Sequence, residues 1–234
     1  MVDDLALRRA LIQYVRATLG PYSIGETLYR LTDLSVEVLG CDGAGVSVID
    51  GAGDLRFVSA TDEFIVPAEQ RQIAAREGPC QQTFATSTAV RVVDLQAERE
   101  RWPDYSRAAL DAGCRAVMSV SIDVGEGSIG ALDLYRRQIH EWTDQELAAA
   151  ELLADMAAGY IANLRTLSNS KRLSEQLQHA LDSRIVIEQA KGVIAERRTI
   201  GVREAFQLLR GTARHHRRPI HDVARDVVDQ RLEI

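Results

Sequence analysis

The chain has 234 residues, of which 46% are hydrophobic and 26% charged, a composition typical of a globular protein with room for one large or two modest domains. Its apolar stretches are shorter than the roughly 20 residues of a membrane-spanning helix, and its N-terminus lacks a signal-peptide pattern. We therefore expect a cytoplasmic protein. Three isolated cysteines, Cys41, Cys80 and Cys114, argue against a disulfide framework or a paired-cysteine zinc site.

Charge is distributed unevenly along the chain. Residues 1–170 hold 15 Lys and Arg against 25 Asp and Glu, a net −10, whereas residues 171–234 hold 13 against 9, a net +4. Together they give the −6 of the whole chain. A basic tail on an acidic body is expected where only the tail meets nucleic acid, because phosphate neutralisation supplies the sequence-independent part of such binding.

The first part of the chain alternates between helical and strand-like patterns. In chain order, periodicity and turn residues predict helices 5–19 and 24–39, strands 44–50 and 55–60, helices 63–77 and 80–86, strand 89–93, helix 103–112, and strands 116–124 and 128–135. The glycine-containing turns 51–54 and 125–127 join two of the strand pairs into hairpins. This order predicts an α+β fold in which helices cover an antiparallel sheet.

A long helix is predicted next. Residues 143–146 form a capping box, and the polar pause at residues 167–170 contains neither glycine nor proline. One helix over about residues 144–198 is therefore predicted, with a hinge at 168–170 as the alternative. Alternate steps of four and three residues describe the seam of a parallel coiled-coil homodimer, made of Leu173, Leu177, Ala180, Arg184, Ile187, Lys191 and Ile194.

The tail predicts a small all-α unit. Thr199-Ile200-Gly201 ends the long helix at a place where glycine can take the left-handed cap conformation. A second amphipathic helix is predicted over 202–216, and Pro219 separates it from a third helix over about 220–228. We expect one α+β domain in residues 1–165 and a three-helix domain in residues 166–234.

This tail resembles the ANTAR domain, the RNA-binding output module of bacterial antitermination regulators. The matching residues are Ala180-Leu181, Ser183-Arg184, Ile187, Ala190-Lys191-Gly192, Ala205-Phe206, Leu209-Arg210, Ala213-Arg214 and Asp222-Val223-Ala224. The resemblance implies a homodimer that binds tandem stem-loops in nascent leader RNA and so prevents a terminator hairpin from forming.

The preceding region is similar to the GAF domain of bacterial sensors over residues from about 22 to 165, although its strand pattern alone would also suit a PAS-like domain. The matching segments are residues 77–80, 93–95, 101–103, 112–115 and 129–134. The resemblance implies either an unidentified small-molecule ligand between sheet and helices or a role in dimerisation alone. Candidate pocket residues are Cys80, Asp94, Trp102 and Asp133. For Cys80, a buried small residue is favoured over a redox-active thiol.

Cations in the tail are the candidate RNA contacts, because guanidinium groups suit phosphates and can stack on loop bases. The candidates, with one glycine, are Arg184, Lys191, Gly192, Arg197, Arg198, Arg203, Arg210, Arg214, His215, Arg217 and Arg218. By position alone, Arg184 and Lys191 would pair with Glu188 or with a partner helix, but the ANTAR resemblance favours RNA. Gly192 carries a helix penalty of about 1 kcal/mol, which favours close packing of Phe206 over an approach of RNA.

The sequence favours a regulator over an enzyme, since it contains no GxSxG, GxxxxGK[ST] or HExxH motif. A metal site at His215 and His216 lacks an evident third ligand. The main prediction is a GAF-ANTAR antiterminator. One alternative is a helix-turn-helix DNA-binding factor, although its third helix has few base-reading residues. Another is a dimeric ligand sensor whose tail recruits protein.

Overall fold

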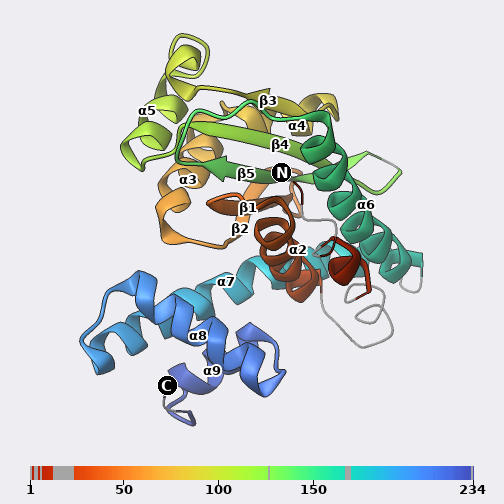
Figure 1. Ribbon diagram of the computed structural model, residues 1–234. Helices are drawn as coiled ribbons and strands as arrows, with labels where there is room; N and C mark the ends of the chain where they lie inside the picture. Colours follow the sequence, from red (N-terminus) through yellow and green to blue (C-terminus); the bar gives the residue numbers. More distant parts are fainter. Residues whose placement is uncertain are drawn as a thin grey trace. The chain divides into compact units, whose positions relative to one another are not determined.

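The computed structural model describes residues 2, 5, 7–12, 24–125, 127–166, 170–232 and 234, without the side chains of residues 163–182. The chain forms two compact units, Met1–Leu177 and Gln178–Ile234, and each is described by itself (Figure 1). Of the described helices, none is long and apolar enough to cross a membrane.

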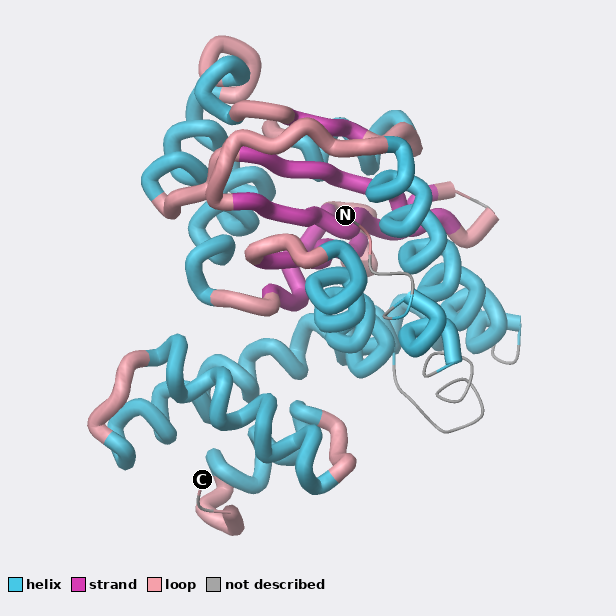
Figure 2. The backbone as a smooth tube through the Cα atoms, in the orientation of Figure 1, coloured by secondary structure: helices cyan, strands magenta, loops and turns pink. Residues whose placement is uncertain are grey.

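The first unit is built on a five-stranded antiparallel sheet, drawn in magenta in Figure 2, with strand order β2-β1-β5-β4-β3. Its strands are β1 (Gly43–Ile49), β2 (Leu55–Ala60), β3 (Val90–Val92), β4 (Ala116–Asp123) and β5 (Ser128–Arg136). Both predicted hairpins are confirmed, because β1 pairs with β2 and β4 pairs with β5. The central strand β5 is buried along nearly its whole length, as expected of a strand with helices on both faces.

Helices cover both faces of this sheet (Figure 1). One layer contains α2 (Ile24–Leu39) and α6 (Asp144–Thr166), and the other contains α3 (Val66–Ala75), α4 (Pro79–Thr86) and α5 (Pro103–Asp111). Two short 3-10 turns, η1 (Glu63–Ile65) and η2 (Leu95–Glu98), complete the second layer. Side chains alternate across a strand, so successive residues of β5 face opposite helical layers.

Most predicted helices of the first unit are confirmed, with shifts at their ends. The predicted helix 63–77 begins as η1 and ends early, because Arg76 takes a left-handed conformation with φ 53°. Residues 7–12 are helical, and the remainder of the predicted helix 5–19 lies mostly outside the described residues. The capping box is confirmed, since the Glu146 amide donates to Thr143 Oγ1 and the Thr143 amide to Glu146 Oε2.

The predicted long helix is recorded as two helices, α6 and α7 (Ser170–Arg198), on either side of residues 167–169, which lie outside the described residues. A single helix over 144–198 and a hinge at 168–170 both remain predictions. The second unit contains the C-terminal part of α7 with α8 (Val202–His216) and α9 (Ile220–Val228). Both short helices match their predicted bounds.

Apolar side chains from all three helices form the core of the second unit, with Ile194 of α7, Leu209 of α8 and Val223 of α9 fully buried. The predicted helix end between α7 and α8 is correct, but the residue responsible differs. Thr199 takes the left-handed conformation with φ 55°, whereas Gly201 is extended at φ −67°, ψ 153° and caps α8. Glycine was therefore not needed for the left-handed turn.

Candidate functional site

The exposed cations of the second unit come from the end of α7, from α8 and from the turn that follows α8. On α8, Ala205, Leu209 and Ala213 face the core, whereas Arg203 and Arg214 lie on the exposed side of the helix, as the 3.6-residue period allows. The exposed members of the predicted RNA-binding set are Arg197, Arg198, Arg203, Arg214, His215, Arg217 and Arg218. We call these seven residues the basic surface; over the interval 197–218 the sequence contains one acidic residue, Glu204.

Two predicted RNA contacts are buried instead. Lys191 is 2% exposed and Arg210 is 5% exposed. The Lys191 ammonium lies 2.8 Å and 3.0 Å from the two carboxylate oxygens of Glu188 and 5.1 Å from the centre of the Phe206 ring. The Arg210 guanidinium lies 5.3 Å from the same ring. The contact of Lys191 with the Phe206 ring joins α7 to α8, whereas Arg210 lies on the same helix as the ring. The contact of Lys191 with Glu188 is the alternative that position alone favours.

Among the described residues, none packs closely on Gly192. It is exposed, and a Cβ built on it would meet no atom within 4 Å. The interpretation that the Phe206 ring packs closely on this glycine is therefore wrong: the ring lies against Lys191 and Arg210.

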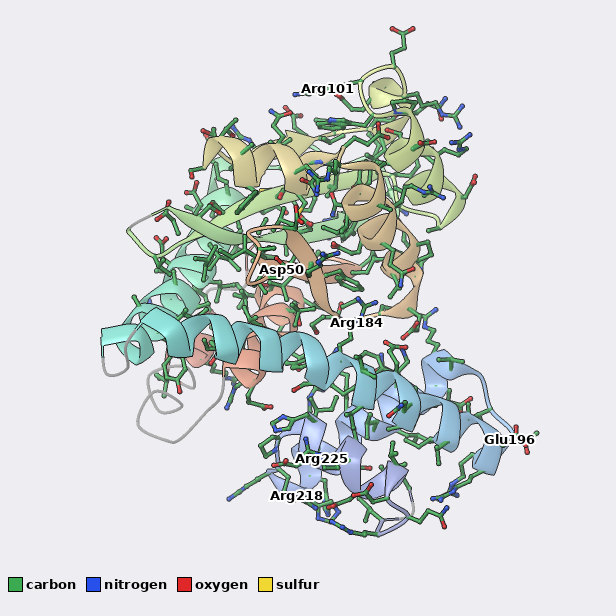
Figure 3. The ribbon with its side chains drawn as sticks, turned by 180° about the vertical axis from the view of Figure 1, so that it is seen from behind. Asp50, Arg101, Arg184, Glu196, Arg218 and Arg225 are labelled. Atoms are coloured by element: carbon green, nitrogen blue, oxygen red, sulfur yellow. The ribbon has the colours of Figure 1, made fainter. Side chains whose placement is uncertain are left out.

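The predicted dimer seam can be followed only in its C-terminal half. Ile187 and Ile194 are buried within a single chain, so their apolar surface is covered without a partner helix. Arg184 is half-buried on α7 (Figure 3). The side chains of Leu173, Leu177 and Ala180 lie outside those that the structure describes. Coiled-coil pairing through these residues stays a prediction.

Several exposed cations make contacts within the second unit. Arg218 Nη2 lies 2.6 Å from Asp226 Oδ2, and the Arg198 guanidinium donates to the carbonyl oxygen of Ile234 over 2.7 Å. Figure 3 shows Arg218 and Arg225 on the α9 side, and Glu196 near the end of α7. Solvent-exposed contacts of this kind contribute little to stability, so these cations can exchange them for phosphate.

A buried polar cluster lies between the sheet of the first unit and α3. Gln72 Nε2 donates to Glu69 Oε2 over 3.0 Å and to Asp133 Oδ2 over 2.8 Å. The Tyr135 hydroxyl donates to Glu69 Oε1 over 3.1 Å, and the backbone amide of Cys80 donates to Gln72 Oε1. Within the described part of the chain, the donors to both carboxylates are thus neutral, and Asp133 Oδ1 has no hydrogen-bond partner.

The cluster favours protonated carboxyl groups. Burial raises the pKa of Glu69 well above its ordinary value, and the negative charge of Asp133 raises it further. Burial likewise raises the pKa of Asp133 to about 6, even though hydrogen bonds lower it in part. Two charged carboxylates this close and this dry would repel each other, so we expect at least one to hold a proton.

Local backbone geometry makes room for this cluster. Gly45 of β1 lies opposite Asp133 of β5 in the sheet, and a Cβ on Gly45 would stand 2.0 Å from Glu69 Oε1. The Glu69 carboxyl therefore occupies the volume that any other residue at position 45 would fill. Glu69, Gln72 and Tyr135 were not predicted as site residues; the one sequence signal for them is the spacing of Glu69 and Gln72, which puts both on one face of a helix.

The four predicted pocket residues lie in three different environments. Cys80 and Asp133 belong to the cluster, and burial raises the pKa of the Cys80 thiol, which agrees with a buried small residue and not with an activated thiol. Trp102 is buried in the core edge-on to Tyr105, with ring centres 6.3 Å apart. Asp94 is half-buried in an ion pair with Arg115 and, among the described residues, makes no hydrogen bond to the cluster, so its role as a pocket residue stays a prediction.

Partial burial acts to raise the pKa of Asp94, but the amide of Gln96 and the Arg115 guanidinium together hold it below its ordinary value. Asp94 is therefore a structural residue that caps η2 and fixes the loop. Among the described residues, no group of three or more His, Cys, Asp or Glu side chains is arranged to hold a metal ion.

An α+β unit followed by an all-α unit with a basic surface is the arrangement of a two-part regulatory protein. Family comparison agrees: the GAF domain model matches residues 23–161 and the ANTAR domain model matches residues 175–228. The chain belongs to the GAF-domain family and carries a C-terminal ANTAR domain. It is therefore an RNA-binding antitermination regulator with a GAF sensor domain, and both domains are regulatory and not catalytic, although some proteins with GAF domains are enzymes.

Solved structures with this fold have diverse functions. The GAF domain of an Acinetobacter phosphoenolpyruvate-protein phosphotransferase matches with a TM-score of 0.54 at 13% identity, over 72% of this chain and 99% of that one. The free methionine-R-sulfoxide reductase of Neisseria meningitidis matches with 0.54 at 18% identity, over 72% and 96%. A Synechocystis GAF domain in its photoproduct state matches with 0.52 at 15% identity, over 62% and 97%. Comparison with curated proteins gave no significant match. These likenesses concern the fold alone.

Proposed function

We propose that this protein, as a homodimer, binds tandem stem-loops of a leader RNA through the basic surface of its second unit, and that its GAF domain regulates this binding. The observation that carries the proposal is that the cations of α8 and its neighbouring segments fall into a buried group and an exposed group. Those that contact Phe206 are buried, whereas Arg203, Arg214 and Arg217 are exposed. A rigid helical unit with outward guanidinium groups suits the phosphates of a folded RNA.

A DNA-binding helix-turn-helix is disfavoured by the charge of α9, the helix that would enter the major groove. Its accessible side chains include Asp222 and Asp226 beside His221 and Arg225, and Asp229 follows at its C-cap. Carboxylates at these positions would face phosphates on both sides of the groove, so α9 is better suited to packing than to reading base pairs.

The test is a binding titration of the full chain against an RNA with two stem-loops and against duplex DNA of equal length, each over a salt series. We expect tighter binding of RNA and a linear fall of log affinity with log salt. Arg214→Ala should weaken binding and lower the salt slope by about one, as the loss of one phosphate contact requires. Tighter binding of DNA would contradict the proposal, and absence of binding to either would favour a protein-recruiting tail.

Dimerisation has a separate readout. Two binding units on one dimer make the second RNA contact intramolecular, so a two-loop RNA should bind at least tenfold more tightly than a one-loop RNA. Light scattering should report two chains per particle with and without RNA. Single chains in both conditions would contradict the homodimer without contradicting RNA binding.

Regulation by the GAF domain has a structural route within the first unit. Three residues after Asp133, β5 carries Arg136, whose Nη2 lies 3.1 Å from Glu146 Oε1 in the first turn of α6. The buried Glu146 also accepts hydrogen bonds from His140 and from the Thr143 amide. A change at the buried cluster would therefore reach the base of α6 through one strand. Asp133→Asn should alter both amide exchange in the first turn of α6 and RNA affinity; unchanged values of both would contradict this route.

A further inference from the structure

Gly211 is an exposed glycine in the interior of α8. A Cβ built on it would meet no atom within 4 Å, so none of the described residues requires its small size. Glycine inside a helix is less favourable than alanine by about 1 kcal/mol. Among the described residues nothing offsets this penalty, and the α8 backbone at Gly211 is open to a partner that approaches it closely.

The neighbours of Gly211 on the helix surface suit a nucleotide base. Residues three and four positions away lie beside it, and these are Gln207 and Leu208 on one side and Arg214 and His215 on the other. Leu208 is 39% exposed and offers apolar surface. His215 is exposed, with its ring edge-on to His216 at 5.0 Å between centres. The patch thus combines a flat floor, an apolar edge and groups that stack or donate hydrogen bonds.

Gly192 of α7 shows that an open glycine alone is not enough. It is equally exposed and equally open, but the residues four positions before and after it are Glu188 and Glu196, both exposed. Carboxylates on both sides would repel the phosphates that flank any base. The two glycines are sterically alike, but the charges of their neighbouring residues differ. These charges favour Gly211 as the place where RNA approaches.

We propose that Gly211 forms the floor of a docking site for one unpaired loop base of RNA, with Leu208, Arg214 and His215 as its walls. This inference rests on the proposed function and specifies the part of the RNA that meets α8. Loop bases are unstacked and turned outward, and proteins bind them by stacking on planar side chains and by hydrogen bonds to their edges. A methyl group at position 211 would occupy the space in which the base lies against the helix.

The experiment compares Gly211→Ala with the matched control Gly192→Ala in the full chain. Both variants replace an open helical glycine, so both should keep or slightly raise the melting temperature of the second unit. Gly211→Ala should weaken binding of a two-stem-loop RNA on the order of tenfold, the scale of one lost base-stacking contact. Gly192→Ala should bind like the wild type.

Two further readouts separate a base contact from a phosphate contact. The salt slope of Gly211→Ala should equal that of the wild type, because no phosphate contact is lost. On an RNA whose loop nucleotides are abasic, the wild type and Gly211→Ala should bind equally well. Wild-type affinity in Gly211→Ala, or an equal loss on abasic RNA, would overturn this inference alone. No binding of stem-loop RNA by the wild type would overturn the proposed function, and this inference with it.

Discussion

The two units of this protein place their charged groups in opposite ways. The first unit buries Glu69 and Asp133 completely, and neutral side chains are their hydrogen-bond donors among the described residues. The second unit exposes most of its cations and buries only those that lie on Phe206. Buried charge is energetically expensive and sensitive to protonation, whereas exposed charge affects stability little but is available to a ligand.

This contrast gives each unit its own response to substitution. Changes at the acidic cluster should alter the free energy of unfolding and its pH dependence directly, and RNA affinity only through the proposed route from β5 to α6. Changes at the basic surface should alter affinity for RNA and its salt dependence. A substitution that gave the opposite pattern would break the comparison, and the predictions that follow are arranged from the largest expected effect to the smallest.

Gly45→Ala should produce the largest effect. The added Cβ would stand 2.0 Å from Glu69 Oε1 and 2.7 Å from its carboxyl carbon, in a region without free space. Glu69 would have to leave its hydrogen bonds with Gln72 and Tyr135, and we expect the first unit to lose about 2–5 kcal/mol of stability. Urea unfolding followed by circular dichroism measures this loss.

Gly159→Ala in α6 is the control for Gly45→Ala, because a Cβ at Gly159 would meet no atom within 4 Å. It should leave stability unchanged or raise it by up to about 1 kcal/mol. Equal stability of the Gly45 and Gly159 variants would show that the carboxyl of Glu69 moves aside freely and that the cluster is not tightly packed.

The pH dependence of the first unit should carry the signature of raised carboxyl pKa values. Between the ordinary pKa of Asp133 and its folded value of about 6, the unfolded chain has released a proton that the folded chain keeps. The unfolded state therefore binds fewer protons, and this group's contribution to stability falls as the pH rises through that interval. The raised pKa of Glu69 acts in the same direction.

Asp133→Asn isolates this contribution. An amide at position 133 can accept from Gln72 through one atom and place its NH₂ where Asp133 Oδ1 has no partner. As the pH rises from about 4 to about 7, the free energy of unfolding of the wild type should fall. The fall in the variant should be smaller by a few kcal/mol. Urea unfolding at both pH values tests it, and parallel pH profiles would mean that Asp133 is ionised throughout.

The sequence predicted the elements that hold these sites better than the sites themselves. Periodicity located helix 24–39 and both hairpins, because those signals are local. The acidic cluster depends on the register that places Gly45 beside Asp133 and on α3 lying over that pair, which no local pattern contains. Lys191 shows a related limit, because a heptad seam and the inner face of a three-helix unit have nearly the same spacing, and periodicity alone does not distinguish them.

Lys191 provides the next test, of intermediate size. Its ammonium is 2% exposed and bound to Glu188, so it is placed to support the α7–α8 contact and not to reach phosphate. Lys191→Ala should destabilise the second unit by about 1–3 kcal/mol through lost packing on Phe206. Lys191→Met keeps the stem, and should retain most of the stability and near wild-type RNA affinity. A large loss of affinity in a stably folded Lys191→Met variant would show instead that this cation reaches RNA.

Arg218→Ala should have the smallest effect on stability. The ion pair with Asp226 joins side chains that are 43% and 23% exposed, so its loss should lower the free energy of unfolding by less than about 1 kcal/mol. RNA affinity should fall by the amount that one phosphate contact contributes. Asp226→Asn removes the same pair but leaves the guanidinium for RNA. Both variants lose the Arg218–Asp226 ion pair, so binding titrations of both distinguish an RNA contact from a role in positioning α9. RNA affinity should fall in Arg218→Ala and hold or rise in Asp226→Asn. An equal fall in both would mean that Arg218 serves to position α9, and that the basic surface does not extend to the turn after α8.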